Sequence, residues 1–137
     1  MKRILVVGAG GQIGTELVPF LRGIYGVENV IAADLNDILL EKFKVSDNAP
    51  VVRIDAMDYK GFEAVVKENN IDTIFNLVAL LSAKGERNPV LAWNLNMTAL
   101  TNSLNIAKDN GCAVFTPSSI GAFGVSTPHD NTPQDTI

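Results

Sequence analysis

The segment ILVVGAGGQIG, residues 4–14, decides the fold of this 137-residue chain. Its first four residues are an unbroken aliphatic run, which predicts a short strand covered on both faces. Gly8, Gly11 and Gly14 follow at a spacing of three. A strand, a glycine turn and a helix in this order aim free N–H groups and the positive end of the helix dipole at the turn. The segment therefore predicts a diphosphate site.

Each glycine has its own expected role. Gly8 permits the tight turn, Gly11 lets phosphates approach the backbone, and Gly14 lets the helix lie close to the sheet. The spacing is G-x-x-G-x-x-G rather than G-x-G-x-x-G, because Ile13 stands at the sixth position of the second pattern. We expect a dinucleotide to contact Gly8, Gly11, Gln12, Ile13 and Gly14. The alternative is a plain turn without a ligand.

Composition narrows the class of protein. With 47% hydrophobic and 19% charged residues, the chain is typical of globular proteins rather than disordered ones. Fifteen acidic residues outnumber 11 scattered basic ones, so we expect no nucleic-acid partner. No apolar run predicts a signal peptide or a membrane span, so we expect a cytoplasmic protein without a membrane partner. Cys112 and His129 are single, so we expect neither a disulfide within the chain nor a metal site.

Hydrophobic blocks alternate with helical patterns along the chain. The blocks predict strands at residues 3–7, 30–33, 51–54, 73–78 and 113–116. Strands that alternate with helices predict an α/β fold with a doubly wound parallel sheet of the Rossmann type, in the strand order 3-2-1-4-5. We expect residues 1–124 to form the dinucleotide-binding domain and residues 125–137, which contain Pro128 and Pro133, to form an irregular tail.

The helical spacers differ in how clearly their pattern defines them. Ile13, Leu17 and Leu21 predict the buried face of the first helix, which Pro19 should kink. A long helix is expected over residues 90–107. Residues 37–44 predict either a short helix or an irregular excursion.

Acidic residues end the second and third strands. Asp34 lies twenty residues past Gly14, where a carboxylate can accept both hydroxyls of an adenosine ribose and repel the 2′-phosphate of NADP. This position predicts NAD as the cofactor, with a solvated turn residue as the alternative. Asp55 and Ala56 are expected on the adenine side. Asp58 fits the N-cap of the next helix.

The fourth and fifth strands end in small, apolar or hydroxyl residues. Leu77, Val78 and Ala79 are expected to line the inner ribose of the cofactor. The fifth strand runs into TPSSIGAFG, which brings Ser118 and Ser119 to the carboxyl edge of the sheet, where ligands bind in open α/β folds. A serine there can hydrogen-bond the reacting oxygen of a substrate. The alternative is that it caps the following turn.

Together these motifs resemble the extended short-chain dehydrogenase/reductase superfamily. The segments that carry the resemblance are GAGGQIG, DAMD, IFNLVA and SSIGAFG, and LLSAKGERNP is similar to the NAD-dependent L-threonine 3-dehydrogenases within it. The resemblance runs from Lys2 to Pro128. It implies an oxidoreductase that converts L-threonine to 2-amino-3-ketobutyrate and passes the hydride to NAD. It also implies a homodimer.

The resemblance assigns further roles residue by residue. Ser119 matches the catalytic Ser/Thr. Asn96 matches the first Asn of the motif N-V-x-G-T-x-N and is implied to lie at the cofactor, although Ala99 and Leu100 replace the motif's Gly and Thr. Ser82 and Gly85 fall in a loop expected beside the substrate.

One expected feature of that superfamily is missing from this sequence. Its general base is a Tyr followed four residues later by a Lys, but Tyr25 is followed by Asn29 and Tyr59 by Glu63. We therefore expect the cofactor half of a dehydrogenase, truncated after the fifth strand and nearly inert alone, with an unpaired edge strand and an exposed helix face. The alternatives are the same half of a sugar-nucleotide epimerase/dehydratase, which LLSAKGE disfavours, and a non-catalytic dinucleotide-binding module.

Overall fold

The computed structural model describes residues 2–80, 82–119, 123–128 and 130–133. Five parallel strands form one sheet in the order β3-β2-β1-β4-β5, which confirms the predicted topology. Each predicted strand is present, with its ends moved by at most two residues. The strands are β1 (Ile4–Val7), β2 (Val30–Asp34), β3 (Val51–Arg53), β4 (Thr73–Asn76) and β5 (Ala113–Phe115).

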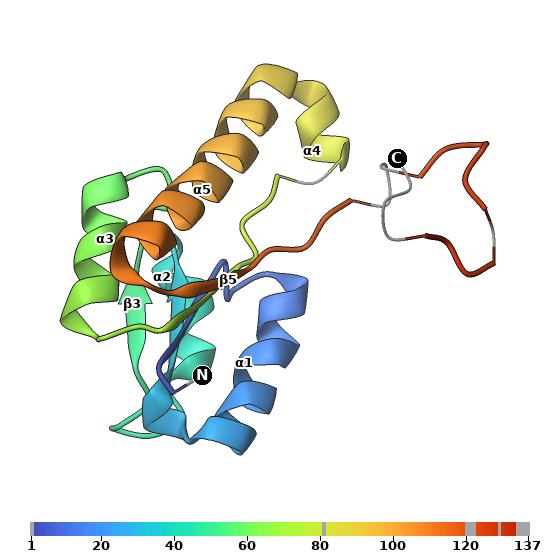
Figure 1. Ribbon diagram of the computed structural model, residues 1–137. Helices are drawn as coiled ribbons and strands as arrows, with labels where there is room; N and C mark the ends of the chain where they lie inside the picture. Colours follow the sequence, from blue (N-terminus) through green and yellow to red (C-terminus); the bar gives the residue numbers. More distant parts are fainter. Residues whose placement is uncertain (1, 81, 120–122, 129, 134–137) are drawn as a thin grey trace.

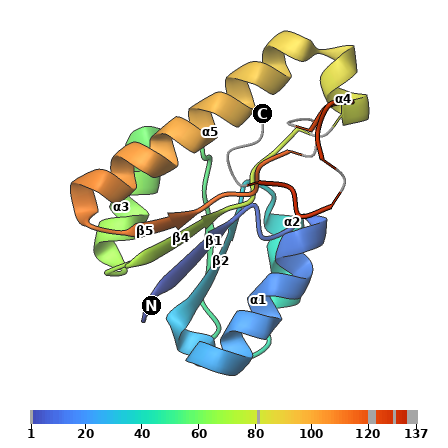
Figure 2. The same cartoon turned by 45° about the vertical axis from the view of Figure 1, so that its right-hand side comes forward.

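Helices cover both faces of the sheet (Figures 1 and 2). One face carries α1 (Gln12–Tyr25), α2 (Asp37–Leu40) and the 3₁₀ turn η2 (Glu41–Phe43). Of the two forms predicted for residues 37–44, a short helix or an irregular excursion, the structure has the short helix α2, followed by η2. The other face carries α3 (Tyr59–Glu68) and α5 (Pro89–Asn110). The remaining elements are the 3₁₀ turn η1 (Val27–Asn29) and α4 (Ser82–Arg87).

The central strand β1 explains the aliphatic run in the sequence. Leu5 and Val7 belong to the hydrophobic cluster beneath α3 and α5, while Ile4 and Val6 belong to the cluster beneath α1. Successive side chains of a strand point to opposite faces, so a strand that is covered on both faces needs an apolar residue at every position. All four side chains are buried.

The predicted buried face of α1 is partly wrong. The helix turns Gly14, Val18 and Leu21 toward the sheet, while Ile13 is 58% exposed. Gly14 has no side chain, so the helix approaches the strand closely there and this contact sets its rotation. Ile13 is thereby directed to the carboxyl edge of the sheet. The helix continues through Pro19 to Tyr25.

The prediction of a loop that contains Ser82 and Gly85 is also wrong. Residues Ser82–Arg87 form α4, a short helix that packs against α5 (Figure 1). Most residues of the stretch AKGER are good helix formers, and this preference exceeds the cost of its single glycine. Asn88 then starts α5, because its side chain accepts a hydrogen bond from the Leu91 N–H.

The end of the sheet beyond β4 is open to solvent. β5 is an edge strand, and Phe115 on it is 53% exposed. Apolar side chains of α5 are exposed as well, namely Val90, Leu91, Trp93, Met97 and Leu104. The expected exposed edge and helix face are therefore both present.

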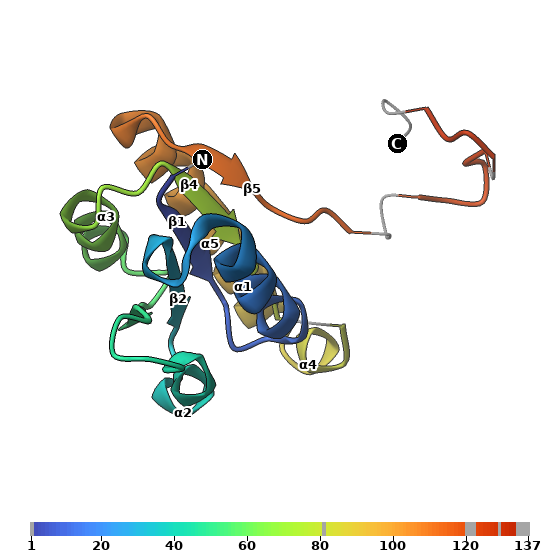
Figure 3. The same ribbon diagram turned by 90° about the horizontal axis from the view of Figure 1, so that it is seen from below.

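The chain beyond β5 extends away from the sheet (Figure 3). The described residues between 116 and 133 contain no helix or strand, and the Thr127 N–H donates to the Gly124 carbonyl in a turn. A domain boundary at Gly124 stays a prediction. None of the described helices has the length and apolar character needed to cross a membrane.

Candidate dinucleotide site

The glycine turn follows β1 and contacts the carboxyl end of β2 and the chain that leaves β4. The N–H groups of Gly8 and Ala9 both donate to the Ala33 carbonyl of β2, each at 2.9 Å. Gly8 has φ +80°, and a Cβ on it would lie 3.0 Å from the backbone between Leu77 and Val78. A side chain at this position would therefore be strained by the backbone angle and crowded by the chain leaving β4.

The start of α1 is left open for an anion. Gly11 is the N-cap residue and supplies no side-chain cap, and the first turn carries no acidic residue. The first N–H groups of an α-helix have no acceptor within the helix. The open N-terminus therefore offers backbone donors and the positive end of the helix dipole to a phosphate.

Gly14 holds this helix end against the strand. A Cβ built on Gly14 would lie 2.4 Å from the Ala9 carbonyl oxygen and 2.6 Å from the Ala9 Cα. Both contacts are with backbone, which cannot swing aside as a side chain can. The predicted role of Gly14 in close packing is therefore visible in the structure.

The Asp34 carboxylate reaches from the end of β2 to the glycine turn. Its Oδ2 accepts a hydrogen bond from the Gly10 N–H at 2.8 Å, and its Oδ1 accepts one from the Asn36 N–H at 3.0 Å. A Cβ on Gly10 would lie 2.8 Å from Oδ2 and 2.6 Å from the Leu39 Cβ. The sequence prediction gave Gly10 no role. The signal that could have revealed it is the fourth glycine in a seven-residue turn.

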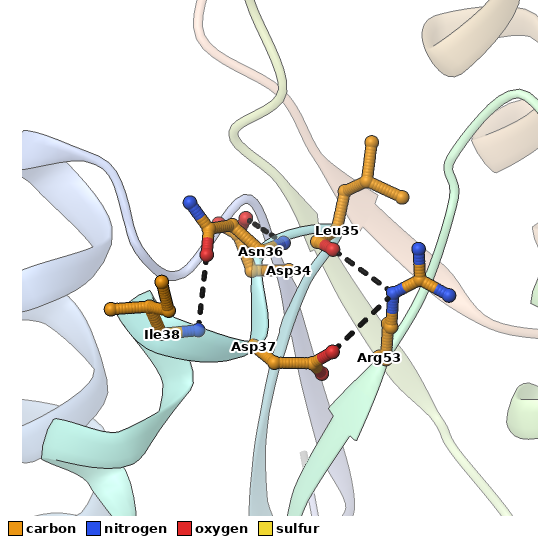
Figure 4. Close-up of polar contacts among 6 residues, drawn as sticks. All are labelled: Asp34, Leu35, Asn36, Asp37, Ile38 and Arg53. Atoms are coloured by element: carbon orange, nitrogen blue, oxygen red, sulfur yellow. Dashed lines mark hydrogen bonds and ion pairs between the residues drawn. The ribbon is translucent and has the colours of Figure 1, made fainter.

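Polar contacts order the chain that follows Asp34 (Figure 4). Asn36 caps α2 by accepting from the Ile38 N–H at 3.0 Å. The Arg53 guanidinium donates to the Leu35 carbonyl at 3.1 Å and lies 3.6 Å from the Asp37 carboxylate. The Arg53–Asp37 pair is exposed and contributes little to stability.

The residues predicted on the adenine side form a turn after β3. The Asp55 carboxylate accepts from the Met57 N–H at 2.9 Å, and the Ala56 carbonyl accepts from the Asn102 amide at 2.9 Å. Asp58 occupies the predicted N-cap position of α3, although its side chain makes no cap hydrogen bond. Contact of Asp55 and Ala56 with adenine stays a prediction.

A cavity of about 400 Å³ lies between the glycine turn and the ends of β4 and β5. Its volume is within the range typical of small-molecule sites. It brings together eight of the residues that were predicted to contact the cofactor: Gly8, Gly11, Gln12, Ile13, Gly14, Leu77, Val78 and Ala79.

The other residues that line this cavity are Asn76, Thr116, Pro117 and Ser118. Asn76 was missed by the sequence prediction; it is buried, and its side-chain oxygen accepts from the Val78 N–H at 3.3 Å. The sequence signal that could have identified Asn76 is a polar residue at the end of an otherwise apolar strand. Ser118 also lines the cavity, and Ser119 follows it, exposed to solvent. The catalytic role of Ser119 stays a prediction.

Asn96 braces the chain that leaves β4. Its side-chain oxygen accepts from the Leu80 N–H at 2.8 Å, and its side-chain amide lies 3.5 Å from the Leu80 carbonyl. Asn96 therefore positions the segment that forms one wall of the cavity, and its predicted contact with the cofactor stays a prediction.

The two predicted substrate residues lie on α4. A Cβ on Gly85 would lie 3.3 Å from the Ala92 Cβ, so this glycine lets α4 pack on α5. Ser82 begins the same helix, and its side chain lies outside the described part of the structure. The substrate roles of both residues stay predictions.

Comparisons with known proteins agree with this geometry. A family profile described as "NAD dependent epimerase/dehydratase family" matches residues 4–136. The chain is 47% identical over its whole length to an uncharacterized epimerase/dehydratase of Staphylococcus haemolyticus, of which it covers 42%.

Two solved structures extend the comparison. An L-threonine dehydrogenase of Clostridium difficile matches with a TM-score of 0.88 and 47% identity, over 100% of this chain and 42% of the other. A UDP-glucose 4-epimerase of Thermus thermophilus in complex with NAD matches with a TM-score of 0.67 and 25% identity, over 80% of this chain and 34% of the other. The chain thus spans less than half the length of the proteins it matches.

Proposed function

Because the chain belongs to the NAD dependent epimerase/dehydratase family, we propose that it binds NAD and forms the cofactor-binding part of an L-threonine 3-dehydrogenase. The pyrophosphate lies against the N–H groups at the start of α1, beside Gly11 and Gly14. Asp34 accepts the hydroxyls of the adenosine ribose. Leu77 and Val78 line the inner ribose.

The observation that carries the proposal is the pairing of an uncapped helix start with a carboxylate at the same turn. Asp34 lies 2.8 Å from the Gly10 nitrogen, so the acceptor for a ribose and the donors for a phosphate belong to one turn. A 2′-phosphate at this carboxylate would add charge repulsion, which favours NAD over NADP.

The proposed reaction is oxidation of the β-hydroxyl of L-threonine. Hydride leaves the β-carbon for NAD, and the hydroxyl proton passes to a base. Ser119 hydrogen-bonds the reacting oxygen. The support for threonine is the 47% identity to a protein described as an L-threonine dehydrogenase. Neither tyrosine of this chain has a lysine four residues later, so we propose that the base lies in a part of the protein outside these 137 residues.

Replacing Asp34 tests the cofactor assignment. We expect Asp34→Asn to weaken NAD binding about tenfold, because a charged acceptor is lost, and to narrow the preference over NADP. The measurement is calorimetric titration of both dinucleotides. Asp37→Asn is the matched control, since it removes the same charge from the neighbouring helix start and should leave NAD affinity unchanged. Equal effects of the two substitutions would contradict the assignment.

Threonine-dependent production of NADH by a longer protein that contains this chain tests the reaction. We expect NADH absorbance to grow with L-threonine and not with UDP-glucose. The second candidate is a sugar-nucleotide epimerase, which the similarity to the Thermus thermophilus enzyme favours. Turnover of a nucleotide sugar with no oxidation of threonine would decide for it.

A further inference from the structure

A second cavity lies on the α1 side of the sheet. It has a volume of about 410 Å³ and runs between α1, η1 and η2. It shares no described lining residue with the cavity beside the glycine turn. Its apolar wall consists of Pro19, Val27, Phe43 and Val45.

Two cationic side chains line the same cavity. The Arg22 side chain is buried, at 6% exposure, and donates to the carbonyls of Val30, Phe43 and Pro50 at 3.2, 2.6 and 2.8 Å. These bonds engage three of the five N–H groups of a guanidinium. Lys42 donates to the Thr15 hydroxyl at 2.6 Å and the Gly10 carbonyl at 3.3 Å, which engages two of its three N–H groups.

The charge of Arg22 has no acidic partner in the described part of the chain. The ion pairs found there are Lys44–Glu41, Arg53–Asp37 and Lys67–Glu63. Burial lowers the pKa of the Arg22 guanidinium. A buried cation without a counter-ion gains from an anion that reaches it, since the charge is already shielded from water.

We propose that this cavity binds a small organic carboxylate with an apolar body. The carboxylate accepts hydrogen bonds from the unengaged N–H groups of Arg22 and Lys42. The apolar body lies along Pro19, Phe43 and Val45. The apolar wall disfavours a fully hydrated ion as the ligand, and the two cations favour an anion over a neutral hydrocarbon.

Amide NMR of the full 137-residue chain tests the proposal, with hexanoate as the probe. We expect saturable shifts at Gly23, Val27 and Val45. Hexanamide has the same apolar body without the charge, and acetate has the charge without the body. We expect both to bind at least tenfold more weakly than hexanoate.

Two pairs of variants separate charge from folding. We expect Lys42→Met to weaken hexanoate about tenfold, while Lys60→Met on α3 leaves it unchanged. Val45 is 68% exposed, so substitution there does not threaten the core. We expect Val45→Asp to weaken hexanoate about tenfold and the neutral Val45→Asn to leave it within about twofold.

Three results would overturn the proposal. Equal affinity for hexanoate and hexanamide would remove the role of the cations. If Lys42→Met and Lys60→Met weakened hexanoate binding equally, the loss of affinity would be due to the net charge of the protein and not to Lys42 in the cavity. NAD causing the same shifts at Val27 and Val45 would assign the cavity to the cofactor. Failure of NAD to bind anywhere would contradict the proposed function and leave this proposal standing.

Discussion

Two glycines of α1 offer a matched test of the packing at the dinucleotide turn. Both Gly14 and Gly23 lie within the helix, so replacing either with alanine brings the same gain in helix propensity, up to about 1 kcal/mol. Their surroundings differ. A Cβ on Gly23 meets nothing within 4 Å, whereas a Cβ on Gly14 lies 2.4 Å from the Ala9 carbonyl oxygen.

The size of the effect follows from these distances. Ordinary van der Waals contact of a Cβ begins at 3.4 Å, so the Gly14 contact is 1.0 Å too short and the helix must move by about that amount. Overpacking of this kind costs about 1–3 kcal/mol. We expect Gly14→Ala to lower the free energy of unfolding by about 2 kcal/mol and Gly23→Ala to raise it by about 0.5–1 kcal/mol.

Urea unfolding followed by circular dichroism measures both values, and calorimetry measures NAD affinity. A shift of about 1 Å at the helix start misplaces the phosphate donors, so we expect Gly14→Ala to bind NAD at least tenfold more weakly. Gly23→Ala should bind it as the unaltered chain does. Equal stability of the two variants, or unchanged NAD affinity in Gly14→Ala, would show that the close contact of Gly14 with Ala9 does not position the helix start.

Two further predictions concern stability against pH and association. Partial burial acts to raise the pKa of Asp72, but hydrogen bonds from the Thr73 hydroxyl and from two backbone N–H groups outweigh it, so the pKa is lowered. Its contribution to stability is therefore present at and above about pH 4 and is lost as the pH falls through the lowered value. We expect Asp72→Asn to cost about 1 kcal/mol near neutral pH and nothing in strong acid, as measured by urea unfolding across pH; a constant difference would contradict this. Trp93 is 68% exposed on an apolar face of α5, so we expect the chain to self-associate and Trp93→Glu to raise the dissociation constant at least tenfold. Sedimentation velocity measures this change, and identical sedimentation of the two forms would argue against association through α5.

The strands and their order followed from the sequence because local and long-range signals agree there. An apolar block such as residues 4–7 has no other stable place than the middle of a covered sheet. The glycine spacing then identified the turn, and Asp34 identified the end of β2. These features depend on residue type and on position along the chain, which the sequence displays directly.

Other features depended on the final packing and were not predicted. The rotation of α1 is set by the contact of Gly14 with Ala9, which no periodicity of apolar residues reveals. Ile13 was therefore assigned to the core, although it is exposed at the cavity. α4 was missed because a six-residue helix has too few turns to show a pattern.

The polar contacts of the second cavity were the least predictable. Lys42 lies 32 positions from Gly10 in the sequence, yet its Nζ reaches the Gly10 carbonyl. Arg22 lies on α1 among residues that gave no functional signal, and only the fold brings it to three carbonyls of other segments. Such contacts arise from tertiary structure and leave no local motif.

A crystal structure of this chain grown or soaked with NAD is the decisive test of the proposed cofactor site. We expect the pyrophosphate within hydrogen-bond distance of the N–H groups that begin α1, beside Gly11, and the adenosine ribose at the Asp34 carboxylate. An empty glycine turn at saturating NAD, or the dinucleotide bound elsewhere on the chain, would contradict the proposed site.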